Sequence, residues 1–416
     1  MRKRISTLVV ACVFSAQAMG CVSARVLDEE ADRAFRSGDY SKAAARLEEG
    51  LKEEGENGND RLLYLLDLGL TYHQAGEFDK AIKAFQAADR FAEVKDYTKI
   101  SEEVAAFVTN DNMKVYKGED FENVMISTYL AMDYALKGDR EGALVEARRV
   151  NSKLYRMVNE GKRKFTQNAF ARYLSSILYE SDRDWNSAYV DLKKTLELTD
   201  SLPGLGRDLW RVAWLNGMRE DLERWEKKFN LTAEDLAAAK ALHPKNKKAE
   251  IIVLFENGIS PMKVPHPNMQ SIPTFRPRYN PVTHARVQVD GKDTQVDTFP
   301  LFDVQSIAIQ NLQENYDAII AKKMAKAVTR EIVTHKLMHD DRPGLAALVW
   351  IFMAATDQAD LRSWQLLPKD LQIARITVDP GVHTVLLNPV GAVATKEKTV
   401  SVSAGGKVFV GFRTIP

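Results

Sequence analysis

The sequence predicts a multidomain α+β protein, with an N-terminal all-α helical array before a C-terminal α+β domain whose sheet is mainly antiparallel. The array is indicated by a repeated motif, because residues 38–43 (GDYSKA) recur as residues 76–81 (GEFDKA) after about 38 residues. Helical periodicity stops after Lys240. Short apolar runs separated by turn residues follow, and this pattern is typical of strands.

The clearest helix pair is expected at residues 62–92. This stretch has the spacing of a tetratricopeptide repeat, a helix–turn–helix unit of about 34 residues. The matching positions are Leu68, Gly69, Tyr72, Gly76, Phe78, Ala81, Phe85 and Ala88. We expect the small Gly69 and Ala81 to let the two helices approach closely, and Gly76 to end the first helix in a left-handed turn. Such repeats bind other chains and rarely perform chemistry, so the stretch predicts a binding protein.

Four more units are predicted around this one, at residues 27–52, 124–154, 168–198 and 208–229. In the fourth unit Arg183 replaces the turn glycine, and in the fifth Gly217 is the best sign of a turn. At least three units are needed to bury a continuous core, and this chain exceeds that number. The predicted helical domain therefore spans residues 21–243.

The concave face of the array is predicted to be apolar. Its candidate partner-binding residues are Leu63, Leu66, Leu70, His73, Met125, Met132 and Leu136. One interpretation is a groove for an apolar helix or an extended peptide of a partner. The alternative, which we favour, is that the chain's own spacer or C-terminal region fills the groove, because exposed apolar surface of this extent is unusual on a monomer.

The C-terminal domain is predicted at residues 249–416. Residues 250–255 indicate a buried strand, and the Pro-rich loop 260–281 is expected to be extended and irregular. That loop holds a candidate interface of aromatic and arginine side chains: Phe275, Arg276, Arg278 and Tyr279. The alternative, which we favour, is a long crossover that packs against the sheet.

Turn dipeptides predict three hairpins in this domain. Asp290-Gly291 separates residues 285–289 from 294–298, and this dipeptide is a strong hairpin signal. Pro380-Gly381 is expected to join residues 371–378 to 383–387, and Gly405-Gly406 to join 399–403 to 407–412. Helical periodicity predicts helices at residues 305–337 and 345–355.

A metal site is the only catalytic possibility that the residue pattern offers. Glu331, His335 and His339 are four residues apart, so they share one helix face, and two histidines at this spacing can hold a metal. The metalloprotease signature is absent, because Lys336 stands where it needs a glutamate, and further ligands would be needed, such as Asp340 or Asp341. The alternative, which we favour, is a solvated cluster at a helix C-terminus, where the dipole favours cationic histidine. We therefore expect no catalytic residue and no cofactor.

The first residues are predicted to be a targeting segment. Basic residues at positions 2–4 precede an apolar run at 8–18 that is too short to span a bilayer, as in a secretory signal. The following Ala18-Met19-Gly20-Cys21 resembles the lipobox of bacterial lipoproteins. The resemblance implies a signal peptide at residues 1–20, cleavage before Cys21 and lipids on that cysteine, which anchor a protein firmly. Val22 stands where an aspartate would retain a lipoprotein in the inner membrane, so the resemblance implies the outer membrane. The alternative is an ordinary signal peptide with a chance cysteine.

Cysteine usage and charge exclude several classes of function. The two cysteines, Cys12 and Cys21, both lie in this first segment, so the mature chain is expected to have no cysteine nucleophile and no zinc–thiolate site. The 58 basic side chains nearly balance the 57 acidic ones. We therefore expect no nucleic-acid partner, since no strong positive field would attract one.

Residues 250–263 (EIIVLFENGISPMK) and 360–387, which include Arg362-Ser363-Trp364, resemble a family of repeat-bearing lipoproteins from Gram-negative bacteria. The resemblance implies the architecture and a periplasmic location, and no activity. We expect Trp364 to pack in the core and Arg362 to pair with a carboxylate such as Asp360 or Asp357. The leading hypothesis is a lipid-anchored scaffold or adaptor that binds protein partners in cell-envelope assembly. The alternatives are a metal-dependent envelope enzyme that uses His335 and His339, and a purely structural lipoprotein.

Overall fold

The computed structural model describes residues 28–96, 114–159, 168–291, 295–339, 358–392 and 394–416. The predicted signal segment with Cys21 lies outside the described residues, as do Asp340, Asp341 and the helix expected at 345–355. In the described part, helices come first, and strands with one pair of helices among them follow.

Within the described residues, five helix pairs form the N-terminal array and confirm the predicted units. They are α2 (Glu29–Arg36) with α3 (Tyr40–Glu54), α4 (Arg61–Ala75) with α5 (Phe78–Asp96), α7 (Asp120–Lys137) with α8 (Arg140–Asn159), α9 (Ala169–Ser181) with α10 (Trp185–Leu198), and α11 (Leu205–Leu215) with α12 (Arg219–Phe229). The helix α13 (Ala233–Ala241) follows. Aspartates cap several of these helices at their N-termini. Asp39 caps α3 and Asp184 caps α10, and each side chain accepts a hydrogen bond from the backbone N–H of the residue three positions later.

The turns inside the pairs follow the predicted chemistry. Gly76 has a φ of 76° and Gly138 a φ of 85°, the left-handed conformation that glycine adopts without strain. Within the second pair, a Cβ on Gly69 would lie 2.6 Å from a ring carbon of Phe85, so the close approach of α4 and α5 requires glycine there. In the fourth pair Arg183 adopts the left-handed turn with a φ of 62°.

In the part of the chain that the structure describes, the strands form two four-stranded sheets and a separate hairpin. The first sheet has the order β10-β1-β7-β6, with β1 and β10 parallel and the other pairs antiparallel. The second sheet has the order β5-β4-β8-β9 and is antiparallel throughout. The bounds are β1 Ala249–Asn257, β2 Met262–His266, β3 Met269–Arg276, β4 Ala285–Val289, β5 Gln295–Asp297, β6 Phe299–Asp303, β7 Asp370–Val378, β8 Gly381–Pro389, β9 Lys396–Val402 and β10 Lys407–Thr414.

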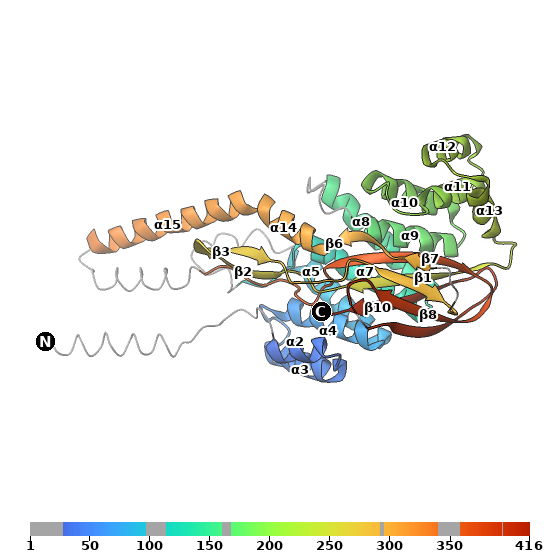
Figure 1. The fold of residues 1–416 in the computed structure, drawn as a ribbon. Coiled ribbons are helices and arrows are strands. Elements are labelled where there is room, and N and C mark those ends of the chain that lie inside the picture. Colours follow the sequence, from blue (N-terminus) through green and yellow to red (C-terminus); the bar gives the residue numbers. More distant parts are fainter. Residues whose placement is uncertain (1–27, 97–113, 160–167, 292–294, 340–357, 393) are drawn as a thin grey trace.

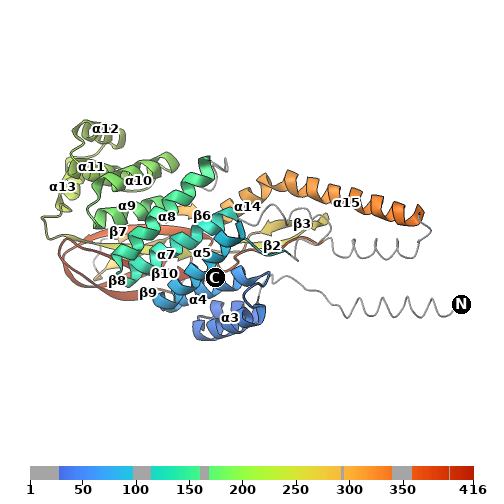
Figure 2. The ribbon, with the colours of Figure 1, turned by 180° about the vertical axis from the view of Figure 1, so that it is seen from behind.

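The first sheet lies between the helical array and the second sheet. Every residue of β1 is buried, and its two faces belong to different cores. Ile252 and Leu254 join the core formed with the array, whereas Ile251, Val253 and Phe255 join the core between the two sheets. Figures 1 and 2 show this order from opposite sides, with strands in front of the helices in one view and behind them in the other. The helical array and the first sheet therefore share one core, and the two sheets share a second.

Two of the three predicted hairpins are wrong. The Asp290-Gly291 hairpin is confirmed by the pairing of β4 with β5. The strands on either side of Pro380-Gly381 are not paired, because β7 belongs to the first sheet and β8 to the second. Around Gly405-Gly406, β9 belongs to the second sheet and β10 to the first. The physical reason is burial, because β7 is largely buried and has to lie inside the middle layer, whereas β8 alternates between buried and accessible residues, as in an outer sheet.

The Pro-rich segment and the following helix also differ in detail from expectation. Instead of an irregular loop, residues 262–276 form the hairpin of β2 and β3, in which Pro265 lies opposite Pro273. The helix expected at 305–337 is two helices, α14 (Val304–Glu314) and α15 (Tyr316–His339). Both views show α15 extending away from the body of the molecule. Among the described helices, none has the length and apolar character needed to cross a bilayer.

Candidate functional site

The chain's own strands cover the concave face of the array. Six of the seven predicted groove residues are at most 5% exposed, namely Leu63, Leu66, Leu70, His73, Met125 and Met132, and Leu136 is partly buried. Ile252 and Leu254 of β1 belong to the same core, and Trp364 packs its ring against Phe85 and Tyr129. The predicted open groove is therefore wrong for this structure, and the alternative of a groove filled by the chain itself is the one observed.

A buried histidine joins the array to the first sheet. His73 of α4 places Nδ1 2.5 Å from an Asp133 oxygen of α7 and Nε2 3.0 Å from Glu256 Oε1 of β1. The Tyr129 hydroxyl donates to Glu256 Oε2 at 2.7 Å, and Arg413 of β10 lies 3.4 Å from the same oxygen. All five side chains are buried. Two carboxylates thus face one imidazole and one guanidinium.

The charges in this cluster stabilise one another. Burial alone would lower the pKa of His73, but the carboxylates of Asp133 and Glu256 outweigh it and raise that pKa to about 10. Burial alone would raise the pKa of Glu256, but His73, followed by Arg413 and Tyr129, lowers it to about 2. At neutral pH the histidine is therefore cationic and Glu256 is ionised, so the cluster is an ion pair between the two halves.

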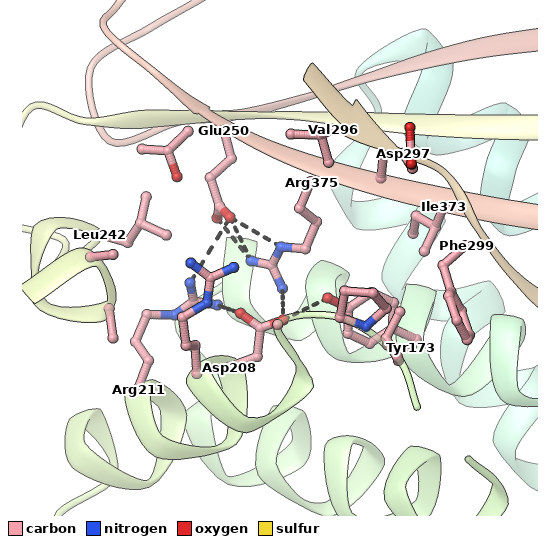
Figure 3. Close-up of a pocket in the computed structure, with 18 residues that line it drawn as sticks. Tyr173, Asp208, Arg211, Leu242, Glu250, Val296, Asp297, Phe299, Ile373 and Arg375 are labelled. Atoms are coloured by element: carbon pink, nitrogen blue, oxygen red, sulfur yellow. Dashed lines mark hydrogen bonds and ion pairs between the residues drawn. The ribbon is translucent and has the colours of Figure 1, made fainter. Parts of the chain in front are cut away.

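A second buried cluster lies at the other end of β1, around Glu250 (Figure 3). Arg375 of β7 points between carboxylates, with Nη2 2.8 Å from Glu250 Oε1 and Nη1 3.2 Å from Asp208 Oδ2 of α11. Arg375 also bonds to Glu180 of α9 at 3.0 Å. The Tyr173 hydroxyl donates to Asp208 at 2.5 Å. Arg375 therefore ties two helices of the array to the middle of the first sheet.

The same cluster contains two more cations. Arg211 of α11 bonds to Glu180 at 2.8 Å, and Lys407 of β10 contacts both Glu180 and Glu250. Cations lower the pKa of Glu180 well below its usual value despite complete burial. A cavity of about 170 Å³ adjoins Glu250, Arg375 and Tyr173. Three cations thus meet three carboxylates, so the cluster is balanced.

A third cluster surrounds Arg362. Its guanidinium bonds to Asp60 Oδ1 at 3.0 Å and to Asp360 Oδ2 at 2.7 Å, which confirms the predicted pairing with Asp360. The backbone N–H of Trp364 donates to Glu122 of α7 at 2.7 Å, and the ring is buried as predicted. This segment therefore joins the second and third repeat units to the C-terminal half.

The first two clusters together fix the position of β1 on the array. On the face turned to the helices, β1 presents Glu250, Ile252, Leu254 and Glu256 in order, so that a carboxylate stands at each end of an apolar centre. Replacing either carboxylate would leave buried cations unpaired, and that is costly. The arrangement specifies the register of the strand against the array. Matched, buried charges of this kind join the helical array to the strand.

The predicted metal residues lie apart from these clusters. Glu331, His335 and His339 are exposed on α15. In the described part of the chain, no group of three or more His, Cys, Asp or Glu side chains is placed to hold a metal ion. The further ligands named for this site, Asp340 and Asp341, lie outside the described residues, so the metal site stays a prediction.

The predicted interface residues have divided roles. Phe275, in β3, packs against the main core, and Arg278 donates to Gln365 Oε1 at 3.1 Å. Burial lowers the pKa of Arg278 to about 10, with help from the nearby charge of Arg36. Arg276 and Tyr279 remain exposed, and Tyr279 is 83% accessible. The segment is thus partly fastened to the body and leaves an aromatic ring in solvent.

Sequence reasoning missed the clustered charges. Glu250 begins the apolar run 250–255 that predicts a buried strand, and Glu256 follows it directly, but neither has a role in the predictions from sequence. Two carboxylates in such a strand require buried cations as partners, so the run itself contained a signal. The identity of those partners was not accessible, since His73 lies 183 residues from Glu256.

Comparisons with known proteins find a distant likeness to repeat arrays over about half of the chain. A crystal structure of MamA aligns with 52% of this chain and 99% of its own, at 17% identity and a TM-score of 0.33. A putative kinesin light chain from Podosopora anserina with TPR-like repeats aligns over 51% of this chain and 92% of its own length, at 14% identity and a TM-score of 0.33. BtubC (BKLC) from P. vanneervenii aligns over 52% of this chain and 80% of its own length, at 20% identity and a TM-score of 0.32. No family model and no curated protein matches the chain.

Proposed function

We propose that this protein is a lipid-anchored scaffold or adaptor at the outer membrane, facing the periplasm, that binds protein partners in cell-envelope assembly. The signal-like N-terminal segment and the lipobox-like residues that end at Cys21 support the anchor. The helical-repeat array supports the binding role, because repeats of this kind present surfaces to other chains. The filled concave face means that the partner uses a different surface.

The observation that carries the binding role is an exposed apolar stripe on α15. Met324, Val328 and Ile332 follow one another at intervals of four residues, so they lie on one side of the helix, and Met338 stands further along. Each is at least 58% exposed. Scattered apolar residues on a surface are ordinary, but a contiguous stripe on a projecting helix is typical of an interaction site.

The occupant that we propose is the apolar face of an amphipathic helix from a partner protein. Helices pair through residues at intervals of three and four, which is the spacing of this stripe. Exposed Lys336, His335 and His339 stand at its C-terminal end. The matching end of the partner helix is therefore expected to carry carboxylates.

Photo-crosslinking in intact cells tests this proposal. A photoreactive residue at Val328 should give an adduct with one protein, and Ile332→Asp should remove that adduct. The same photoreactive residue at Val145, which is 47% exposed on α8, is the matched control. Equal adducts at both positions, or an adduct that survives Ile332→Asp, would refute a specific surface on α15. The anchor is tested separately by incorporation of labelled fatty acid, which Cys21→Ser should abolish.

The filled groove favours a second candidate function, the purely structural lipoprotein. In this case the array exists to hold the first sheet, and no partner binds α15. The two candidates predict different outcomes for Ile332→Asp, since a structural protein would keep its cellular role and its crosslinking pattern. Metal analysis of the purified protein addresses the enzyme alternative, because one equivalent of zinc lost in His335→Ala would favour it.

A further inference from the structure

Arg183 occupies a backbone position that costs energy. Its φ of 62° places it in the left-handed region, where the turns of other helix pairs have glycines such as Gly38, Gly76 and Gly217. An L-residue with a Cβ is disfavoured there by about 1–2 kcal/mol relative to the right-handed form. Residues held in unfavourable conformations cluster at functional sites, so the position calls for a reason.

The Arg183 side chain lines a cavity of about 290 Å³ between the array and the C-terminal domain. The walls come from the start of α8, the α9–α10 turn, α11, the linker after α13 and the β9–β10 turn. This volume is near the lower end of the range for small-molecule sites. The cavity adjoins the Glu180 cluster on the side of Lys407, whereas Figure 3 shows the neighbouring cavity beside Glu250 and Arg375.

The lining is strongly cationic. Arg140, Arg183, Arg211 and Lys407 line the cavity, against the single carboxylate of Glu180. Arg211 and Lys407 already pair with Glu180, and Arg140 contacts Asp182 at 3.6 Å. Within the described residues, the Arg183 side chain has no recorded ion pair or hydrogen bond. Its charge is therefore available to a bound anion.

Apolar groups complete the wall. The Trp185 ring, which is partly buried, lines the cavity together with Leu215, Leu242 and Pro244. A flat aromatic surface beside arginines suits a ligand that has both a ring and a negative charge. Burial also lowers the pKa of Lys407, and a bound anion would oppose that effect.

We propose that this cavity binds a small anionic molecule, a phosphate or carboxylate joined to a flat apolar group, with Arg183 as the residue that contacts the anion. The proposal goes beyond the scaffold role and does not depend on α15 or on the lipid anchor. A ligand here would touch the fourth and fifth repeat units and the β9–β10 turn at once. It would therefore reinforce the contact between the two halves.

Calorimetric titration of the purified protein at low salt tests the proposal, with phenyl phosphate as the probe. Wild-type protein should bind it saturably, and inorganic phosphate and benzyl alcohol should each bind more weakly, because they lack the ring or the charge. Arg183→Gly should weaken the binding of phenyl phosphate at least about tenfold, the size of one lost charge-assisted contact. Arg183→Lys, which keeps the charge, should bind within a few-fold of wild type.

The matched control is Arg33→Ala, which removes one exposed positive charge far along the array. Its binding should equal that of wild type. A second readout is stability: Arg183→Gly should raise the melting temperature by about 1–4 °C, since the relief of strain exceeds the entropy cost of glycine. No saturable binding by wild type, equal binding by Arg183→Gly, or equal loss in Arg33→Ala would each overturn the proposal. Equal binding of inorganic and phenyl phosphate would overturn the role of the apolar wall.

Discussion

Glu256→Gln is the sharpest test of the clamp between the array and the first sheet. The substitution keeps the shape of the side chain and removes its charge. Glu256 accepts hydrogen bonds from His73 at 3.0 Å, Gln74 at 2.6 Å and Tyr129 at 2.7 Å, and it pairs with Arg413 at 3.4 Å. After the change, two buried cations share the single carboxylate of Asp133.

Two arguments give a similar loss of stability for Glu256→Gln. Removing one partner of a buried ion pair costs about 3–5 kcal/mol, because an uncompensated charge is left inside the protein. The pKa of Glu256 falls from 4.5 to about 2, and that difference corresponds to roughly 3 kcal/mol of stability at neutral pH. We therefore expect Glu256→Gln to lower the free energy of unfolding by about 3 kcal/mol, a large share of the stability of a typical domain.

Urea unfolding at pH 7, followed by circular dichroism and tryptophan fluorescence, measures this change. The control is Glu223→Gln, which removes a carboxylate from the exposed pair with Lys227 and should leave unfolding unchanged. The pKa of Glu256 is lowered in the folded protein, so its contribution is present above about pH 4.5 and is lost as the pH falls toward 2. The difference between wild type and variant should shrink in that interval. A difference below about 1 kcal/mol at pH 7 would refute the ion-pair interpretation.

Three further predictions concern buried residues of the helical array. The pKa of His73 is raised to about 10, so its contribution to the free energy of unfolding is present below pH 6.5 and is lost as the pH rises through 10. In urea unfolding, His73→Gln should therefore lose less stability than wild type over that pH range. Burial, with the charge of Glu119, raises the pKa of Glu122 to about 7, so the free energy of unfolding falls as the pH rises from 4.5 through 7. In urea unfolding at pH 5 and pH 8, Glu122→Gln should show a smaller difference between the two pH values than wild type. Gly69→Ala should lower the free energy of unfolding by about 1–3 kcal/mol, because its Cβ would lie 2.6 Å from Phe85; an unchanged urea midpoint would contradict the close packing of α4 on α5.

The helix pairs could be predicted because their signals are local. Apolar spacing, capping aspartates and turn glycines all act within one unit of about 34 residues, and even the fourth unit, with Arg183 at its turn, forms as expected. The strands were also found, but their partners were not. Pro380-Gly381 marks a turn correctly, yet a turn does not show whether the chain folds back on the same sheet or passes to another.

The candidate site was less accessible than the fold. The apolar character of the groove could be read from residues such as Leu66 and Met125, and it correctly implied that something covers them. The charges that select the covering strand could not be assigned, because Glu256 meets His73 and Arg413 across separations of 183 and 157 residues.

The amino-acid sequence by itself determined the five helix pairs, the change to strands after α13, and a concave face too apolar to stand in water. Only the tertiary structure decided that β1 covers this face, and that β7 and β10 flank β1 while β8 and β9 form an outer sheet. The reason is that helix formation depends on residues within a few turns of one another. Strand order and buried charge pairing depend on segments far apart in the sequence, because every buried cation needs a carboxylate and every apolar face needs a covering segment.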